Sequence, residues 1–287
     1  MSKIKIIADS GADIPNDLVQ KYDIEIFSFL SIFGEDTYVS GVELDSKAFF
    51  KKLEETGIIP TTAQTPYTEM DEKIRKYADE YESVIVFTLS SKASGQNNTL
   101  QMIKRDILEE NPNADIRIVD SMSFTIGIGM GVVYAAELAQ SGASADEIVE
   151  KATEYINSWD VYFLVDNLKY LEKGGRINKA SAIIGGLLDI KPVLSIRNGL
   201  VEAVDKFRGK KNLAKKLINK IKENPDFDPS ANQFAVVHAN EQMGEEMVSL
   251  LKQEFENCEI VMYNELGAII GTHTGPDMVG VFFKKKK

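Results

Sequence analysis

The chain has 287 residues, of which 44% are hydrophobic and 27% are charged, and its formal net charge is −11. These values indicate a globular protein with one large or two ordinary domains and a sizeable core. The acidic balance disfavours a nucleic-acid-binding or anionic-membrane-binding surface, because both need clustered basic side chains.

The cysteine content and the start of the chain point to a reducing compartment. Cys258 is the only cysteine, which excludes an intrachain disulfide. The N-terminal residues enter a strand-like pattern at once, so we expect a cytoplasmic protein without a signal peptide. The longest uncharged run, residues 121–136, is too short and too interrupted by glycine to span a bilayer.

In the first half of the chain, short apolar runs alternate with helical patterns, which predicts an α/β domain on a parallel sheet. Asp45 or Ser46 is expected to cap helix 47–55, and Gly57 to end it. Thr65 is expected to be the N-cap of the next helix, with Pro66 at its first position. The expected strands are 4–9, 24–33, 83–89 and 116–120, and the expected helices are 13–22, 47–55, 66–81, one from residue 96, 124–142 and 145–158.

The second half follows a mixed pattern. Asn198-Gly199 lies between two alternating segments of the run 191–208, which is the strongest short-range signal for a β-hairpin. We therefore predict two domains with a ligand between them, an N-terminal parallel-sheet α/β domain (1–158) and a C-terminal mixed α+β domain (159–287). The other expected elements of the second half are strands 161–165, 233–238, 259–266 and 278–283 and helices 210–223 and 241–256.

Small polar residues follow several of the expected strands. The segments 9–11, 90–95 and 120–121 each come directly after an apolar strand, and ligands of open parallel sheets bind beyond such strand ends. Ser94 and Gly95 lie where a helix begins. A hydroxyl and backbone N–H groups can face an anion there, although a plain helix cap is the favoured interpretation.

Further polar residues lie in expected loops and bends. Thr62 belongs to a polar loop that leads into a helix. Thr272, His273 and Thr274 lie in a glycine-rich bend just before the last strand. Together with the Ser94 hydroxyl they form a set of nearly neutral donors, which suits a carboxylate better than a highly charged phosphate.

Two segments near residue 180 allow more than one interpretation. The run 171–177 reads as a helix C-terminus with Gly174 as its left-handed cap. Arg176 is then either a surface charge or a guanidinium held near a carboxylate or phosphate. The apolar run 183–194 fits either the core or a tunnel for a ligand.

Several standard sites are missing from the sequence. The two histidines and one cysteine have no zinc-ligand spacing, no phosphate-binding GxxxxGK[ST] loop occurs, and we expect neither a metal nor a cofactor. Ser94 and His273 could serve as nucleophile and base of a hydrolase. That alternative lacks the GxSxG nucleophile elbow and an assigned acidic partner.

Eight short segments occur in the order that is typical of one protein family. They are DSGADIP, TTAQTP, SSKASG, VDS, LKYLEKGGRI, DIKPVL, KFRGKK and IGTHTGP. The chain therefore resembles the DegV family, and within it the FakB-type fatty-acid-binding proteins of bacterial fatty acid kinase, which serve phospholipid metabolism.

The resemblance implies a carrier that holds one long-chain fatty acid with its tail buried. Thr62, Ser94 and His273 match the family's carboxylate contacts, with Gly95, Thr272 and Thr274 close by. A separate kinase subunit would phosphorylate the bound carboxyl group, with Arg176 and Arg208 as candidates for docking that partner. The residues expected along the acyl tunnel are Ile126, Ile128, Ile183, Ile184, Leu187 and Leu188.

The sequence departs from the family pattern in two motifs. The usual TSQPS reads TAQTP at residues 62–66, so that Thr65 replaces the proline. The usual SSxLSGTY reads SSKASGQN at residues 90–97, with Ala93 for the leucine and Gln96-Asn97 for Thr-Tyr. Carboxylate binding is still expected, because Thr62 and Ser94 are retained.

Two other hypotheses remain open beside the carrier. One is the esterase or thioesterase that uses Ser94 and His273, and the other is a carboxylate-sensing or interaction module that holds no acyl chain tightly. The lysines at the end of the chain allow a transient contact with acidic lipid, although a solvated tail is the favoured interpretation.

Overall fold

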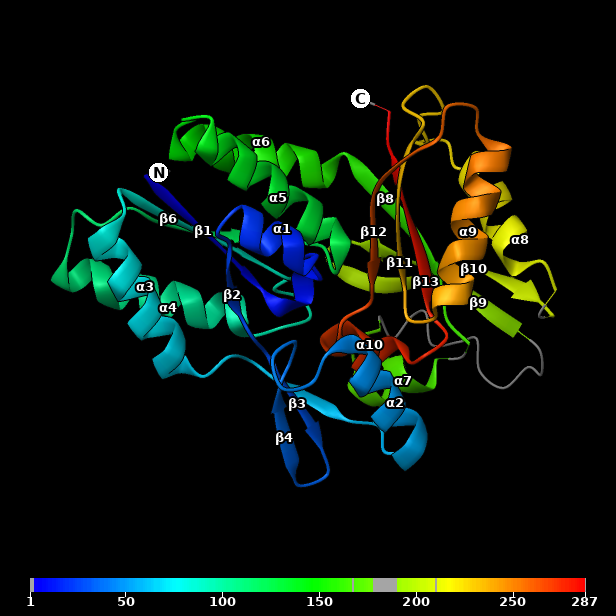
Figure 1. Ribbon diagram of the computed structural model, residues 1–287, viewed down its shortest axis with the longest axis horizontal. Coiled ribbons are helices and arrows are strands. Elements are labelled where there is room, and N and C mark those ends of the chain that lie inside the picture. The colour runs from blue at the N-terminus through cyan, green and yellow to red at the C-terminus, as the bar shows by residue number, and fades with distance from the viewer. Residues whose placement is uncertain (1–2, 167, 178–189, 210, 287) are drawn as a thin grey trace.

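The computed structural model describes residues 3–166, 168–177, 190–209 and 211–286 (Figure 1). These residues form two large sheets and one small sheet with helices packed around them. The expected α/β class is confirmed, with a parallel sheet in the first half of the chain and a mixed sheet in the second. Among the described residues, none of the helices combines the length and the apolar composition that a membrane crossing requires.

The first large sheet is parallel and carries helices on both faces. Its elements are β1 (Ile4–Asp9), the 3-10 turn η1 (Ser10–Ala12), α1 (Asn16–Lys21), β2 (Glu25–Phe27), α3 (Tyr67–Glu80), β6 (Ser83–Thr88), α4 (Gln96–Glu110), β7 (Ile116–Asp120), α5 (Ile126–Gln140) and α6 (Ala145–Asn157). The strand order is β2-β1-β6-β7. Successive side chains of a strand point to opposite faces, so Ile7 and Val86 pack toward α3 and α4, while Ile6 and Phe87 pack toward α5 and α6. These two pairs of helices lie on opposite sides of the sheet (Figure 1).

The second large sheet is mixed, and α8 and α9 cover one of its faces. Its elements are β8 (Trp159–Leu164), β9 (Ile190–Arg197), β10 (Leu200–Arg208), α8 (Leu213–Lys222), β11 (Gln233–His238), α9 (Glu241–Glu254), β12 (Glu259–Glu265) and β13 (Val279–Lys284). The strand order is β10-β9-β8-β13-β11-β12. Along β8, Tyr162 and Leu164 pack toward α8 and α9, whereas Val161 and Phe163 pack in the cluster that contains residues of the parallel sheet, α5 and α6.

The predicted hairpin is present between β9 and β10. Asn198 and Gly199 have φ angles of 51° and 76°, and the two strands pair antiparallel on either side of them. Positive φ at both central residues is the geometry that Asn-Gly supplies at little steric cost.

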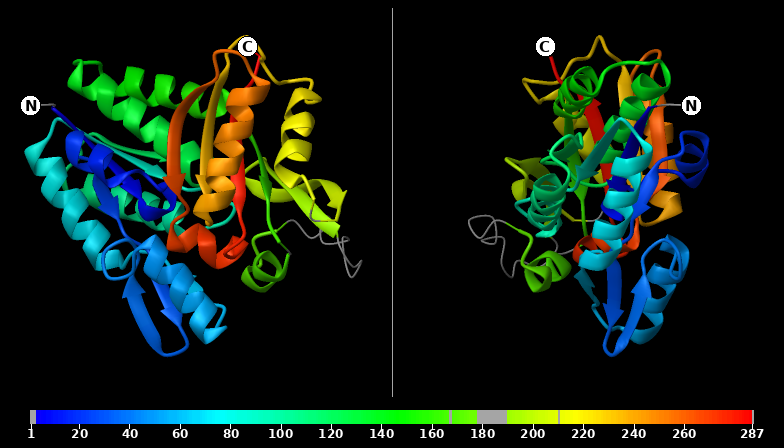
Figure 2. Two further views of the ribbon diagram at one scale, coloured as in Figure 1. Left: turned by 45° about the vertical axis from the view of Figure 1, so that its right-hand side comes forward. Right: turned by 90° about the vertical axis from the view of Figure 1, so that its left-hand side faces the viewer.

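A small antiparallel sheet protrudes from the molecule with one helix beside it (Figure 2). Its strands follow the order β4-β3-β5, and Phe33, Phe49 and Leu53 form its core together with Ala268. The elements around it are β3 (Leu30–Phe33), β4 (Asp36–Val39), α2 (Ser46–Thr56), β5 (Thr61–Ala63), α7 (Lys169–Gly174) and α10 (Ala268–Thr274). As expected, Asp45 caps α2 by accepting a hydrogen bond from the Ala48 N–H.

The small sheet overturns two expectations about local structure. The run 24–33 is two strands in different sheets rather than one, because the chain leaves the parallel sheet after Phe27 and enters the small sheet at Leu30. Residues 61–63 form a strand on β3, not a loop. The β3–β5 pairing joins segments about 30 residues apart, and the β1–β2 pairing joins Ile7 to Glu25, 18 residues further on, so local patterns encode neither.

Two helix ends and one further segment also differ from expectation. Thr65 is not the N-cap of α3, since the cap is Pro66 and the Thr65 hydroxyl donates instead to the Ser28 carbonyl at 3.0 Å. The left-handed cap of α7 is Gly175, with φ of 66°, not Gly174. The residues around His273 are a short helix, α10, and not a bend.

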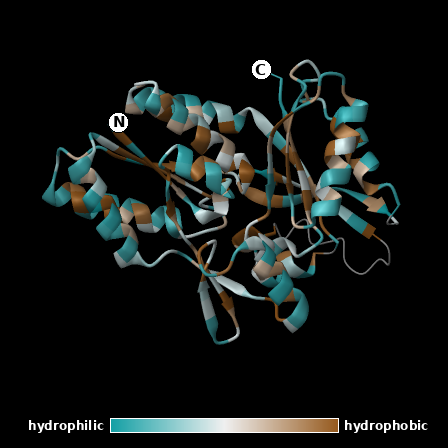
Figure 3. Ribbon diagram, in the orientation of Figure 1, coloured by the Kyte–Doolittle hydropathy of each residue, from teal (hydrophilic) through white to brown (hydrophobic). Residues whose placement is uncertain are grey.

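The two large sheets share one apolar core. Residues of both sheets pack with α5 and α6 in a single cluster, and apolar residues concentrate along the strands while outward helix faces are hydrophilic (Figure 3). We propose a domain boundary at residue 158, because β8, the first strand of the second sheet, begins at Trp159.

Candidate functional site

A cavity of about 260 Å³ lies among the two large sheets and the small one, where the sequence predicted a ligand between the domains. Strands of the second sheet, the turns that follow β6 and β7, and helix α10 supply most of its wall. Most of the apolar side chains in that wall are buried. Among the described residues, the complete apolar part of the wall consists of Phe29, Leu89, Ala93, Phe124, Val161, Phe163, Leu171, Ile196, Val201, Ile269, Ile270, Met278 and Phe282.

Polar residues gather where the cavity approaches the surface. Gly95 and Arg176 are exposed, and Thr62, Ser94 and His273 are half-buried. The rest of the polar wall consists of the half-buried Gln64 and of Thr125 and Thr274, which are buried. The cavity therefore has a deep apolar part and a shallow part that is rich in hydrogen-bond donors.

Two chain segments place the hydroxyls of Thr62 and Ser94. Thr62 is held by β5, where it pairs with Ser31 of β3, and its hydroxyl has no protein partner among the described residues. Ser94 precedes α4, and its Oγ accepts a hydrogen bond from the Gln96 N–H at 3.2 Å. The Ser94 hydroxyl proton remains available, so both side chains can donate to an acceptor in the cavity.

His273 reaches the cavity from α10 and is uncharged at neutral pH. Burial, helped by the nearby Arg176 guanidinium, lowers the pKa of His273 to about 4. Its Nδ1 is buried without a hydrogen-bond partner among the described residues. That atom lies 2.1 Å from where a Cβ on Gly174 would be, so the ring packs against a backbone that only glycine allows.

Arg176 bridges the two halves of the polar end. Its Nε donates to the Ala93 carbonyl at 3.1 Å, and its Nη1 donates to the Gly174 carbonyl at 2.5 Å. The guanidinium therefore links the segment after α7 to the turn before α4, beside the cavity.

Some residues that were expected at the site lie elsewhere. The Thr272 side chain is buried outside the cavity wall and donates to the Ala268 carbonyl at 2.9 Å, an ordinary bond to the preceding helical turn. Thr274 reaches the wall, but its hydroxyl donates to the Ile270 carbonyl at 3.1 Å.

The acyl-tunnel expectation needs correction at its first two residues. Ile126 and Ile128 are fully buried at the start of α5 and belong to the shared core, not to the cavity wall, which Phe124 and Thr125 form at that point. The other expected tunnel residues, Ile183, Ile184, Leu187 and Leu188, lie outside the described residues. Arg208 is exposed at the end of β10 and does not line the cavity.

Several residues of the site were missed in the sequence. Val161, Phe163 and Phe282 line the cavity because alternate side chains of β8 and β13 face it, a signal visible only as ordinary strand alternation. Gln64 also lines the cavity, two residues after Thr62, which had been identified from the sequence.

Asp13 connects three segments that are distant in the sequence. Its carboxylate accepts from the Thr125 hydroxyl at 2.6 Å and from the Gly267 N–H at the start of α10, and its carbonyl accepts from Asn264. Because Thr125 lines the cavity and α10 carries His273, Asp13 supports the site from outside the wall.

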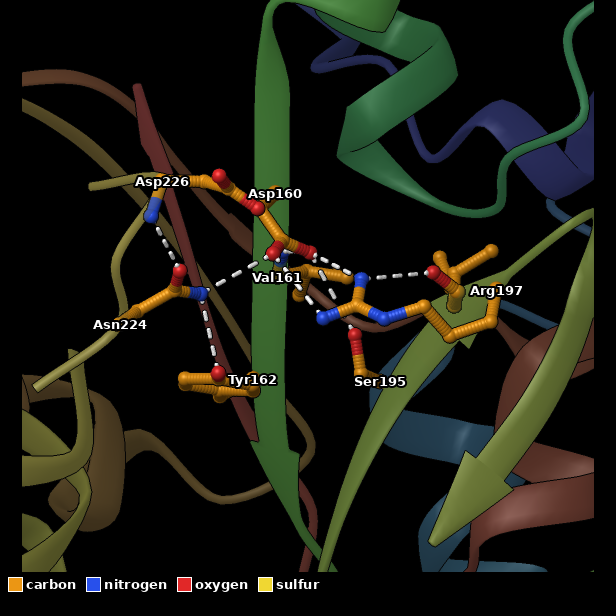
Figure 4. A network of polar contacts seen from close by, with 8 residues as sticks. Asp160, Val161, Tyr162, Ser195, Arg197, Asn224 and Asp226 are labelled. Atoms are coloured by element: carbon orange, nitrogen blue, oxygen red, sulfur yellow. Dashed lines mark hydrogen bonds and ion pairs between the residues drawn. The ribbon is translucent and has the colours of Figure 1, made fainter. Parts of the chain in front are cut away.

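A polar network around the buried Asp160 supports the part of the cavity wall that β8 and β9 form (Figure 4). Asp160 accepts hydrogen bonds from Arg197 at 2.7 and 3.1 Å and from Asn224 at 3.2 Å. Arg197 follows Ile196, and Asp160 precedes Val161, so the ion pair aligns the two strands whose apolar residues face the cavity.

The geometry gives little support to hydrolysis. No hydrogen bond joins Ser94 to His273 within the part of the chain that the structure describes, and the His273 Nδ1 has no carboxylate to orient it. A base whose pKa is about 4 is also poorly matched to neutral pH. The described residues contain no cluster of three or more metal-ligating side chains.

Comparison with known proteins reveals relatives along the whole chain. The model of the family described as "Uncharacterised protein, DegV family" matches residues 3–286. A DegV domain-containing protein of Caldanaerobacter subterraneus is 36% identical, and the match covers 100% of both chains. A fatty acid-binding protein of Thermotoga maritima is 32% identical over 97% of this chain and 96% of its own length.

A solved structure has the same fold over its full length. The crystal structure of DegV, a fatty acid binding protein from Bacillus subtilis, superposes with a TM-score of 0.84, at 29% identity and with 100% of both chains covered. Fold, motif order and family match agree, and the chain belongs to the DegV family.

Proposed function

We propose that this chain binds one long-chain fatty acid, with the acyl tail in the apolar cavity and the carboxylate at its polar end. The observation that carries the proposal is the division of one cavity into a deep apolar wall and a shallow group of donors, Thr62, Ser94 and His273. Relatives of similar length that are described as fatty acid-binding proteins support it.

The energetics suit such a ligand. Each buried methylene contributes about 0.8 kcal/mol, so a tail of a dozen or more contributes roughly 10 kcal/mol before the costs of association. A hydrogen bond to a carboxylate adds on the order of 1.5–3 kcal/mol. The tail therefore provides most of the affinity, and the hydroxyls and the imidazole fix which end faces outward.

Native mass spectrometry of the purified protein, followed by lipid extraction, tests this proposal. We expect a mass excess of one fatty acid that is released on denaturation. A protein that stays free of ligand after incubation with a panel of saturated and unsaturated fatty acids would contradict it.

A serine substitution tests the assigned orientation. Ser94→Ala should weaken binding of the fatty acid about tenfold, since one bond to a charged group is lost. Ser91→Ala, in the same turn but outside the cavity wall, is the matched control. Unchanged affinity in Ser94→Ala would remove Ser94 from the head-group contacts, and turnover of acyl esters by the wild type would favour the hydrolase instead.

The proposed role is that of a carrier whose ligand is modified by a separate kinase. In that reaction a carboxylate oxygen accepts the γ-phosphoryl group of ATP, and ADP leaves. The exposed polar end of the cavity supports the proposal, because a partner can reach the carboxylate there. Arg176 lies beside that end, and Arg208 lies on the outer strand β10.

The kinase role has its own test. A fatty acid kinase with ATP should convert the loaded ligand to an acyl phosphate, which hydroxylamine traps. Arg208→Ala should slow this conversion without changing fatty acid loading, whereas Arg105→Ala, on the surface of α4, should change neither. Equal rates in both variants would exclude Arg208 from docking.

A further inference from the structure

The side chain of Gln64 lies in the cavity wall with Thr62, Ser94 and Gly95. Gln64 directly follows β5 and is half-buried. Its Oε1 accepts a hydrogen bond from the Thr99 hydroxyl of α4 at 3.1 Å. The same oxygen lies 3.9 Å from the position that a Cβ on Gly95 would take, so the amide sits against the turn that carries Ser94.

This arrangement favours one orientation of the amide, because the Thr99 hydroxyl lies nearer to the Gln64 oxygen, at 3.1 Å, than to its other acceptor, the Gly95 carbonyl, at 3.4 Å. A glutamine amide has an acceptor oxygen at one end and two donor N–H groups at the other. Because Thr99 occupies the oxygen, the NH2 group is the end left for another partner, and no protein acceptor binds it among the described residues. A carboxylate is acceptor-only, which matches that free donor.

The backbone on either side of Gln64 is also fixed. The buried Thr65 N–H donates to the Gln96 Oε1 at 3.0 Å, and the Thr65 hydroxyl donates to the Ser28 carbonyl at 3.0 Å. Gln64 is therefore held both through its own side chain and through its neighbour. A donor fixed before binding loses little freedom when a ligand arrives.

We propose that Gln64 is a further head-group ligand, whose NH2 donates to the bound carboxylate, and that Thr99 is the positioning residue that sets the amide orientation. This inference rests on the proposed fatty acid binding and deepens it. With Thr62, Ser94 and His273, Gln64 completes a set of neutral donors around an anionic group. Such a set selects an ionised acid over the alcohol of the same chain length.

The test measures binding of palmitic acid and of hexadecanol to delipidated protein. Gln64→Ala should weaken acid binding about tenfold or more and alcohol binding much less, because the stronger bond is the one to a charged group. Gln64→Glu should reduce the acid-to-alcohol preference further, because a second carboxylate repels the ligand. Gln101→Glu, an exposed substitution on α4, adds the same charge away from the cavity and should change neither.

Thr99 gives an independent arm of the experiment. Thr99→Val removes the hydroxyl that holds the Gln64 oxygen, so acid binding should fall several-fold, and Thr99→Ser should restore it. A merely structural role of Thr99 would weaken acid and alcohol binding equally in Thr99→Val.

Three results would overturn the inference. They are acid affinity in Gln64→Ala within about twofold of wild type, equal losses for acid and alcohol, and no effect of Gln64→Glu beyond that of Gln101→Glu. A wild-type protein that binds neither probe would contradict the proposed function itself. That failure is distinguishable, because the first three results require a wild type that binds palmitic acid.

Discussion

At the residue scale, burial keeps the His273 side chain uncharged at the cavity. Its ring packs on the backbone of Gly174 and stays neutral, so it presents one N–H donor without bringing a buried charge. An anionic ligand then receives a hydrogen bond without the cost of a buried imidazolium.

The depressed pKa of His273 makes stability depend on pH. The folded chain, with a pKa of about 4, binds fewer protons at this group than the unfolded chain, whose value is 6.5. The contribution of His273 to the free energy of unfolding therefore falls as pH drops through that window, by about 2 kcal/mol between pH 7 and pH 5. Urea unfolding of delipidated wild type and His273→Gln should show this extra loss only in the wild type; parallel pH profiles would contradict it.

Asp13 acts in the opposite direction. Burial raises the pKa of Asp13 from 3.8 to about 7, although Thr125 and Gly267 donate to its carboxylate. Between these two values the unfolded chain releases the proton that the folded chain retains, so the free energy of unfolding falls as pH rises through this window. Asp13→Asn keeps one acceptor oxygen for the Gly267 N–H, and its NH2 group can donate to the Thr125 hydroxyl, which then serves as acceptor. Asparagine also tolerates the left-handed backbone of residue 13. The stability of this variant relative to wild type should increase by about 2–3 kcal/mol between pH 5 and pH 8 in urea unfolding. A pH-independent difference would refute this interpretation.

At the scale of elements, two departures from the usual family motifs are joined by one hydrogen bond. Residue 65 is threonine where the usual motif has proline, so its N–H exists and is buried. Residue 96 is glutamine where the usual motif has threonine, and its Oε1 accepts that N–H. The two changes therefore compensate each other, and together they hold the segment after β5 against the start of α4.

Removing the acceptor should expose this coupling. Gln96→Leu leaves the Thr65 N–H buried without a partner, which should lower the free energy of unfolding by about 1–3 kcal/mol. Gln101→Leu, on the exposed face of the same helix, is the matched control. Equal denaturation midpoints for the two variants would show that the hydrogen bond does not stabilise the fold.

Most elements could be predicted because their patterns are local. The strand β1, the helix α2 with its Asp45 cap, and the Asn198-Gly199 hairpin each carry their signal within a few residues. The division of residues 24–33 between two sheets could not, because a strand pattern states which face is apolar but not which neighbour it joins.

At the scale of the whole molecule, the cavity lies where the two large sheets and the small sheet meet. A ligand that fills it contacts strands of the mixed sheet and the turns that follow β6 and β7 of the parallel sheet, so binding should stabilise the complete fold. Palmitic acid at 100 times its dissociation constant should add about 2.7 kcal/mol to the delipidated protein and raise its melting temperature by roughly 5–10 °C. Acetate, which has the head group without the tail, should leave it unchanged; an equal shift with acetate would contradict burial of the tail.

The order of the motifs and the periodicity of most strands and helices could be recognised from the amino-acid sequence without the structure. These features were sufficient for the α/β class and for the resemblance to the DegV family, because each depends on residues close together in the chain. The proposal of Thr62, Ser94 and His273 as head-group contacts followed from that resemblance. Tertiary structure decided that Gln64 joins the wall, that Ile126 and Ile128 belong to the core, and that Asp13 supports α10. Those assignments depend on which parts of the chain, distant in the sequence, pack together. The main driving force of that packing is the burial of apolar area, which is not directional, so a local sequence pattern does not specify the partner.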